Sequence, residues 1–137
     1  WPNTLVVTVA EQQALGRWEN LGAVNVEGEI FKAQADSIPA DLPVFVGPPD
    51  MSKSMVMHYH QFQALLAKEK LKIVAVKVNP RHAWEIQLEG GTLIKLGQSQ
   101  HQERLALVVK AWPTLTKEGI KTLRSVDARY TNGIAVN

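Results

Sequence analysis

The sequence contains no cysteine, which excludes disulfides, thiolate catalysis and cysteine-ligated zinc. Aromatic residues make up only 7% of the chain and charged residues only 20%, and the formal net charge is +2. The lysines and arginines are scattered rather than clustered, and this argues against a nucleic-acid partner. No apolar run is long enough to cross a bilayer, and no signal peptide is recognisable.

What is present fits a folded domain. Hydrophobic residues at 45% of a 137-residue chain are enough for one domain with a sizeable core. The chain opens abruptly on Trp1-Pro2-Asn3 within structured-looking sequence. We therefore expect a fragment, with a membrane or targeting segment missing upstream.

Two segments have apolar residues three and four positions apart, the spacing of amphipathic helices. The first helix is expected to begin at a capping residue, Asp50 or Ser52, and to run to about Lys70. The second is expected over about residues 100–112, because Pro113 discourages continuation.

Short β-rich or alternating segments predict the strands, and the turn pairs Glu27-Gly28 and Gly90-Gly91 between them predict hairpins. The resulting order is strands, helix, three strands, helix, two strands. This order predicts an α+β domain with a mixed, largely antiparallel sheet and two helices packed on one face. The expected strand segments are 5–13, 14–20, 24–26, 30–32, 43–46, 71–78, 83–88, 92–96, 126–131 and 134–136.

The last stretch of the chain predicts a terminal hairpin. Val126, Ala128 and Tyr130 alternate with polar residues, as in a half-buried strand. Asn132-Gly133 then provides a turn in which both residues tolerate positive φ, and residues 134–136 form a short return strand. A strand at this position is expected to be an exposed sheet edge, which can accept a strand from another protein.

Sites for chemistry are not indicated. His58 and His60 are two apart on a predicted helix, where they do not share a face, and no carboxylate follows to complete a metal site. The carboxylates are scattered, and no nucleophile, phosphate-loop or dinucleotide motif occurs. We therefore expect no enzymatic activity, no metal and no cofactor. Trp18, Trp84 and Trp112 are interpreted as core residues.

Several segments together resemble a known family in their order and spacing. They are Trp1–Leu5 with Glu11-Gln12, Ala14–Trp18, Gly28–Phe31, Leu42-Pro43 with Gly47-Pro48, Trp84–Leu88, Leu96-Gly97, Glu103–Leu105, and Val126–Tyr130 with Gly133 and Ala135-Val136. This set resembles the periplasmic β domain of the FtsQ/DivIB family of bacterial cell-division proteins, and the likeness covers nearly the whole chain.

The resemblance implies a domain division and a role. Residues 1–13 would be the last strand of a preceding POTRA domain or the transition from it, and residues 14–137 the β domain. The full-length protein would be a single-pass inner-membrane protein with this domain in the periplasm, at the division septum. It would be a non-enzymatic scaffold that regulates septal peptidoglycan synthesis by binding FtsB, FtsL and other divisome proteins, with FtsB adding a strand at the C-terminal edge.

By position, the resemblance implies that the partner-contacting residues are Arg81, Arg129, Tyr130, Asn132 and Gly133. Arginines select acidic groups by bidentate pairing, a tyrosine is a rigid anchor, and a glycine allows close backbone approach. The residues alone leave a second interpretation open, in which Arg129 is a solvated charge, Tyr130 is core and Asn132-Gly133 is only a turn.

Two other functions remain alternatives. The chain could be a POTRA-associated periplasmic module for outer-membrane protein assembly or secretion, which also uses sheet edges. Several POTRA repeats and a cleavable signal upstream would favour that alternative, whereas a single transmembrane helix would favour division. A hydrolase with an unrecognised site would require a deep polar pocket with clustered carboxylates or histidines.

Overall fold

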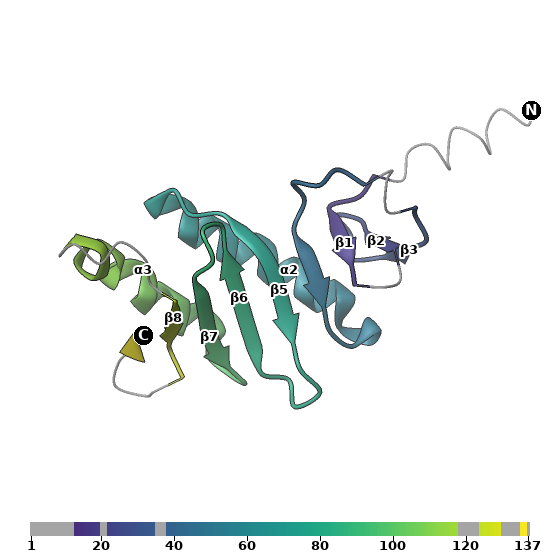
Figure 1. The fold of residues 1–137 in the computed structure, drawn as a ribbon. Coiled ribbons are helices and arrows are strands. Elements are labelled where there is room, and N and C mark those ends of the chain that lie inside the picture. The colour runs from purple at the N-terminus through teal and green to yellow at the C-terminus, as the bar shows by residue number, and fades with distance from the viewer. Residues whose placement is uncertain (1–12, 20–21, 35–37, 118–123, 130–134, 137) are drawn as a thin grey trace, which may run out of the picture.

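The computed structural model describes residues 13–19, 22–34, 38–117, 124–129 and 135–136. These residues form one mixed sheet with the strand order β3-β2-β1-β4-β5-β6-β7-β8-β9, together with the helices α2 and α3 (Figure 1). The predicted order of strands and helices along the chain is confirmed. The α+β class is confirmed as well, including the two helices on one face and the exposed C-terminal edge strand.

The element bounds differ from the predicted segments mainly in length. The helices are α2 (Ser52–Leu66) and α3 (His101–Lys117). The strands are β1 (Gly16–Trp18), β2 (Gly22–Val24), β3 (Ile30–Phe31), β4 (Val44–Val46), β5 (Ile73–Val78), β6 (Trp84–Leu88), β7 (Leu93–Gly97), β8 (Ser125–Asp127) and β9 (Ala135–Val136). The predicted strand over residues 5–13, and with it the proposed boundary at residue 13, falls almost wholly outside the described residues.

Most neighbouring strands are antiparallel, as the repeated hairpins predicted. Three pairs are parallel: β1 with β4, β4 with β5, and β7 with β8. The last two arise because a helix crosses over one face of the sheet between the paired strands, α2 before β5 and α3 before β8. The crossover through α3 therefore brings β8 to the outer side of β7.

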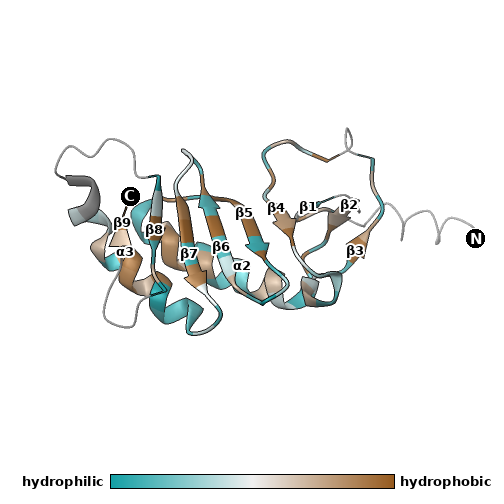
Figure 2. Ribbon diagram, turned by 60° about the horizontal axis from the view of Figure 1, so that its bottom comes forward, coloured by the Kyte–Doolittle hydropathy of each residue, from teal (hydrophilic) through white to brown (hydrophobic). Residues whose placement is uncertain are grey.

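The core lies between the sheet and the two helices, and Figure 2 shows the apolar stretches of these elements. In β6 the buried side chains alternate with half-buried ones, as expected when one strand face packs inward. The predicted helical stripe is confirmed, since Met55, Phe62 and Leu66 are fully buried and Tyr59 is half-buried. The largest fully buried side chains include Trp18, Phe45, Phe62, Met55, Leu66, Ile73, Ile86, Leu88, Ile94, Leu96 and Leu105.

The start of α2 corrects the predicted cap. A short 3-10 turn, Pro49–Met51, precedes the helix, and the N-cap residue is Met51, which has no capping side chain. Ser52 is instead buried, and its hydroxyl donates a hydrogen bond to the Gly28 carbonyl oxygen at 2.7 Å. The serine that was predicted to cap the helix locally therefore fixes the β2–β3 hairpin against α2.

The end of α3 corrects the second helix boundary. The helix passes through Pro113 and continues to Lys117, although a proline in a helix lacks the N–H that would bind the carbonyl four residues earlier. The preceding turns are anchored by Leu105, Val108 and Val109, which are buried against the sheet. Tertiary packing thus outweighs the local cost of the proline.

Candidate partner-binding site

The C-terminal edge of the sheet is formed by β9. In the part of the chain that the structure describes, β9 is last in the strand order and pairs only with β8, antiparallel, with Val126 opposite Val136 and Asp127 opposite Ala135. Both residues of β9 are exposed, and Val136 retains 44% of its accessible surface. In Figure 1 this strand lies beside β8 at the side of the sheet away from β1–β3.

β8 is held firmly to the sheet behind this edge. The Leu93 N–H donates to the Arg124 carbonyl at 3.0 Å, and the Ala128 N–H donates to the Lys95 carbonyl at 2.8 Å. The side chains of Val126 and Ala128 are fully buried, which confirms the face predicted for them. The edge strand β9 therefore pairs with a strand whose inward-facing residue, Val126, is buried in the core.

Arg129 follows β8 and turns back onto it. Its Nη2 lies 2.6 Å from Asp127 Oδ2, its Nε donates to Oδ1 at 2.8 Å, and its backbone N–H donates to the same Oδ1 at 3.1 Å. These hydrogen bonds hold the pKa of the Asp127 carboxyl below its ordinary value. The Arg129 side chain is 54% exposed, so it is accessible while it is engaged by Asp127.

Arg81 lies in the turn between β5 and β6, which Asn79 organises. The Asn79 side-chain oxygen accepts hydrogen bonds from the backbone N–H groups of Arg81 and Ala83, both at 2.9 Å. The turn is tied to the end of β7, because the Gln98 amide donates to the Arg81 carbonyl at 2.9 Å. Arg81 is exposed, and its backbone position is thus fixed from two sides.

The two arginines line one polar pocket of about 400 Å³. They lie there with a third arginine, Arg104, which comes from the first turns of α3 and is half-buried. We call this site the arginine pocket; it is lined by Asn79, Arg81, Ala83, Gly97, Gln98, Ser99, Arg104 and Arg129. Residues far apart in sequence thus meet at the end of the sheet where β7 and β8 both terminate.

Gly97 closes β7 beside this pocket with a φ of +81°, a conformation that favours glycine. A Cβ at this position would lie 3.2 Å from the Cγ of Arg129 and 3.6 Å from Nη1 of Arg104. The missing side chain therefore lets both arginines pack over the end of β7.

The sequence prediction identified part of this arrangement. Arg81 and Arg129 are brought to one pocket, whereas Tyr130, Asn132 and Gly133 lie outside the described residues and stay predictions. Arg104 and Gly97 were not singled out as site residues. Both belong to segments that carry the family resemblance, Glu103–Leu105 and Leu96-Gly97, and that was the available signal.

The histidine at position 58 is a packing residue, and it has a neighbour that the sequence did not predict. The rings of His58 and Trp84 are 4.6 Å apart between centroids, and that of His101 lies 5.8 Å from His58. His58 Nδ1 donates to the Ser54 carbonyl at 2.8 Å, and His101 Nε2 donates to the Gly97 carbonyl at 3.1 Å. No group of three or more potential metal ligands occurs within the described ranges.

The pKa of His101 is lowered, chiefly by burial and further by the positive charges of His58 and Arg104. The hydrogen bond to Gly97 and the charge of Glu103 oppose this shift. His101 is therefore predominantly neutral near neutral pH and sits at the start of α3, next to the arginine pocket.

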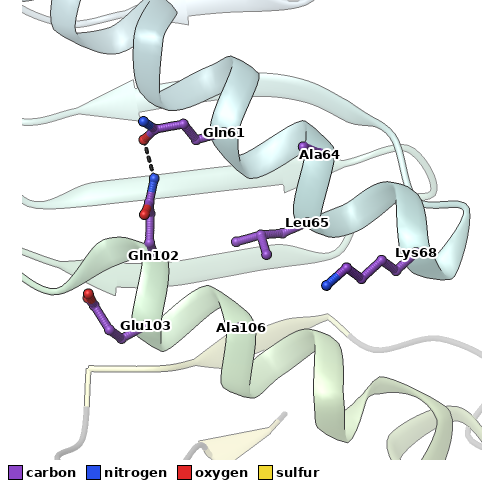
Figure 3. Close-up of a pocket in the computed structure, with 7 residues that line it drawn as sticks. All are labelled: Gln61, Ala64, Leu65, Lys68, Gln102, Glu103 and Ala106. Carbon is purple, nitrogen blue, oxygen red and sulfur yellow. Dashed lines mark hydrogen bonds between the residues drawn. The ribbon is translucent and has the colours of Figure 1, made fainter.

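A second hollow, of about 610 Å³, lies between α2 and α3 (Figure 3). The Gln102 amide donates a hydrogen bond to the Gln61 amide oxygen across it. Its lining offers one lysine and one glutamate and no histidine: Gln61, Ala64, Leu65, Lys68, Gln102, Glu103 and Ala106. Such a lining lacks the clustered acids, bases or nucleophiles that a hydrolytic site requires.

No helix among the described residues combines the length and apolar character that a membrane crossing needs. Residues 16–129 match the family described as Cell division protein FtsQ/DivIB, C-terminal. The chain is 35% identical over 140 residues to a Cell division protein FtsQ of Burkholderia pseudomallei, covering 99% of this chain and 56% of that protein. It is 33% identical over 136 residues to a Cell division protein FtsQ of Coxiella burnetii, with the same coverage of 99% and 56%.

A Cell division protein FtsQ of Nitrosospira multiformis is 35% identical over 135 residues, covering 98% of this chain and 56% of that protein. The chain thus spans somewhat more than half the length of these relatives. The family match extends from the first strand of the sheet to the arginine that lines the pocket after β8. The chain therefore belongs to the FtsQ/DivIB family of cell division proteins.

Proposed function

We propose that this domain is a non-enzymatic scaffold of the division machinery that binds FtsB, in complex with FtsL, by adding a strand of FtsB beside β9. The observation that carries the proposal is the place of β9 as the exposed last strand of the sheet. An exposed edge strand offers backbone groups to a partner strand. The arginine pocket lies at the same end of the sheet as the start of β9.

The full-length protein would place this domain in its context. Residues 1–13 would be the last strand of a preceding POTRA domain or the transition from it, and one membrane-spanning segment upstream would hold both domains in the periplasm at the septum. The domain would link early and late division proteins and regulate septal peptidoglycan synthesis through the partners it holds. The shared family of cell division proteins supports this assignment.

Backbone pairing at β9 cannot supply the whole affinity. The described strand has two residues, Ala135 and Val136, and so offers about two outward hydrogen bonds. At about 0.5–1.5 kcal/mol each, they contribute roughly 1–3 kcal/mol, whereas micromolar binding needs about 8 kcal/mol. Side chains must provide the remainder. Arg81, Arg129, Tyr130, Asn132 and Gly133 are the proposed contacts, with Tyr130 as the anchor.

A pull-down with the periplasmic parts of FtsB and FtsL tests the proposal. Arg129→Glu and Tyr130→Ala should each abolish capture of FtsB, while the circular dichroism spectrum stays that of the folded domain. Lys110→Glu is a matched control, because it makes the same change of charge at an exposed position on α3. It should leave capture unchanged. Full capture by the Arg129→Glu protein would refute the proposed surface.

A further inference from the structure

The exposed residues of α2 and α3 form a surface that we call the helical face. Two of the four exposed large hydrophobic side chains among the described residues lie on it: Met57 is 53% exposed and Leu107 is 45% exposed. The hollow between the helices (Figure 3) continues along them, because a second hollow of about 280 Å³ shares Leu65, Lys68 and Ala106 with it. Apolar surface gathered in this way is typical of a contact site for another protein.

The two helices run in the same direction. In the chain, α2 lies between the parallel strands β4 and β5, and α3 lies between the parallel strands β7 and β8. Because β5 and β7 are both antiparallel to β6, all four strands point one way and both helices point back. The hydrogen bond between Gln61 and Gln102 sets these two residues level. Lys68 is seven residues beyond Gln61 and Lys110 eight beyond Gln102, so both lysines lie about 10–12 Å further along, at one end of the face.

The two ends of the helical face carry opposite charge. Glu103 lies at the end marked by the two glutamines, and Lys68 lies at the other end, as Figure 3 shows. Glu69 also lines the lysine end, so the two lysines leave one net positive charge there against the one negative charge of Glu103. In the part of the chain that the structure describes, neither Glu103 nor Lys110 forms an ion pair. Both charges are therefore available to a partner.

We propose that the helical face binds the same face of a second copy of the chain, with the helices of the two copies antiparallel. On α3 the exposed residues Glu103, Ala106, Leu107 and Lys110 follow one another at helical spacing. Glu103 and Lys110 are equally far from the point between Ala106 and Leu107. A two-fold axis that crosses α3 at this point lays Ala106 and Leu107 against their own copies and places each Lys110 opposite the Glu103 of the other copy. The face is thus complementary to itself in charge.

Electrostatics selects the antiparallel arrangement, and the size of the face sets the strength of the contact. With the helices of two copies parallel, Lys110 would meet Lys110 and Glu103 would meet Glu103, and these like charges repel. The antiparallel arrangement also sets the partly positive N-terminus of each α3 beside the partly negative C-terminus of the other. The 15 residues of α2 span about 22 Å and two helices about 20 Å across, which gives roughly 450 Å² for each copy. A contact of about 900 Å² in all is smaller than stable interfaces, so the dimer is weak and forms at high protein concentration.

Cysteine cross-linking tests the arrangement, because the chain has no cysteine of its own. A single Ala106→Cys substitution should give a disulfide-linked dimer under mild oxidation, since the two thiols would lie near the axis on facing helices. Thr114→Cys is the matched control, because Thr114 is also exposed on α3 but lies about 11 Å from the axis, and so about 22 Å from its counterpart along the helix. The control should cross-link about ten-fold more slowly or less.

Charge reversal in the Ala106→Cys background tests the pairing. Glu103→Lys and Lys110→Glu should each slow cross-linking roughly ten-fold, because the symmetry replaces two attractive pairs with two repulsive ones. In an equimolar mixture, a dimer of one Glu103→Lys copy and one Lys110→Glu copy again has opposite charges in both pairs, so cross-linking between the two variants should return to about the original rate. Circular dichroism checks that each variant is folded, and mixing could not restore a rate lost through unfolding.

Three outcomes would overturn the inference. Equal rates for Ala106→Cys and Thr114→Cys would exclude the antiparallel dimer. Unchanged cross-linking of the Glu103→Lys variant, or no recovery in the mixture, would exclude the pairing of Lys110 with Glu103. If no dimer forms at about 1 mM protein, a second copy is not what the helical face binds. None of these outcomes bears on capture of FtsB, because the helical face includes neither β9 nor Arg129, so the inference does not rest on the proposed function.

Discussion

Replacing Gly97 with alanine tests whether the end of β7 sets the position of the arginines. The residue has a φ of +81°, and holding alanine there costs about 1–3 kcal/mol. The new Cβ would also lie 3.2 Å from the Cγ of Arg129. The Arg129 side chain must therefore shift, and this shift disturbs its ion pair with Asp127. We expect Gly97→Ala to lower the free energy of unfolding by about 1–3 kcal/mol and to weaken partner capture. The melting temperature should fall by roughly 4 °C for each kcal/mol lost.

Gly91→Ala is the matched control for this variant. Gly91 has a φ of +101°, but a Cβ there meets nothing within 4 Å. The backbone cost is thus of the same kind, while the arginine pocket is untouched. Urea unfolding of both variants, followed by the FtsB–FtsL binding measurement, separates strain from displacement. Equal destabilisation of the two variants with unchanged affinity in both would refute the role of Gly97.

Further predictions concern stability. Burial lowers the pKa of His101 in the folded protein below the 6.5 of the unfolded chain, so the unfolded chain binds more protons at pH values between the folded and the unfolded pKa. Stability must therefore fall as pH drops through that window, and the melting temperature should be lower at about pH 5.5 than at about pH 7.5. His101→Gln should shrink this difference in melting temperature. Phe62→Ala should cost about 3–5 kcal/mol in urea unfolding because the ring is fully buried, whereas Met57→Ala, at a 53% exposed position on the same helix, should cost under about 0.5 kcal/mol. Pro113→Ala should raise the free energy of unfolding by up to about 3 kcal/mol, and with it the melting temperature, because alanine restores a helical N–H. An unchanged or lower melting temperature would show that the proline is favoured by its surroundings.

The order of the elements could be predicted because each signal is local. The Gly90-Gly91 turn and the alternation on either side of it define the β6–β7 hairpin within a dozen residues, and the structure confirms this pairing. The apolar stripe of α2 repeats at helical spacing and is likewise confirmed by burial. Such features depend on residues that are neighbours in sequence, so a single sequence contains them.

The predictions that were wrong concern helix ends whose structure depends on contacts with residues distant in the sequence. Ser52 has the right chemistry for a cap, but its hydroxyl is used by the Gly28 carbonyl, which belongs to another hairpin. Pro113 is tolerated because the buried face of α3 holds the helix in place. Nothing in the local sequence reports either contact.

The arginine pocket shows the same limit at the site. Arg81, Arg104 and Arg129 come from a turn, a helix and the end of a strand, and only the crossover through α3 brings them together. The resemblance to a family predicted Arg81 and Arg129 as site residues, whereas Arg104 was not predicted to belong to the site. The contacts expected of Tyr130, Asn132 and Gly133 remain predictions.

The parallel pairing of β7 with β8 has a consequence for the proposed recruitment of a partner. The chain leaves β7, crosses the sheet as α3 and returns as β8, so the β8–β9 edge requires this crossover. A domain whose α3 has not docked has no assembled edge, even if its central hairpin is already formed. Under the proposed function, a partner strand would therefore bind only copies of the domain whose folding is complete.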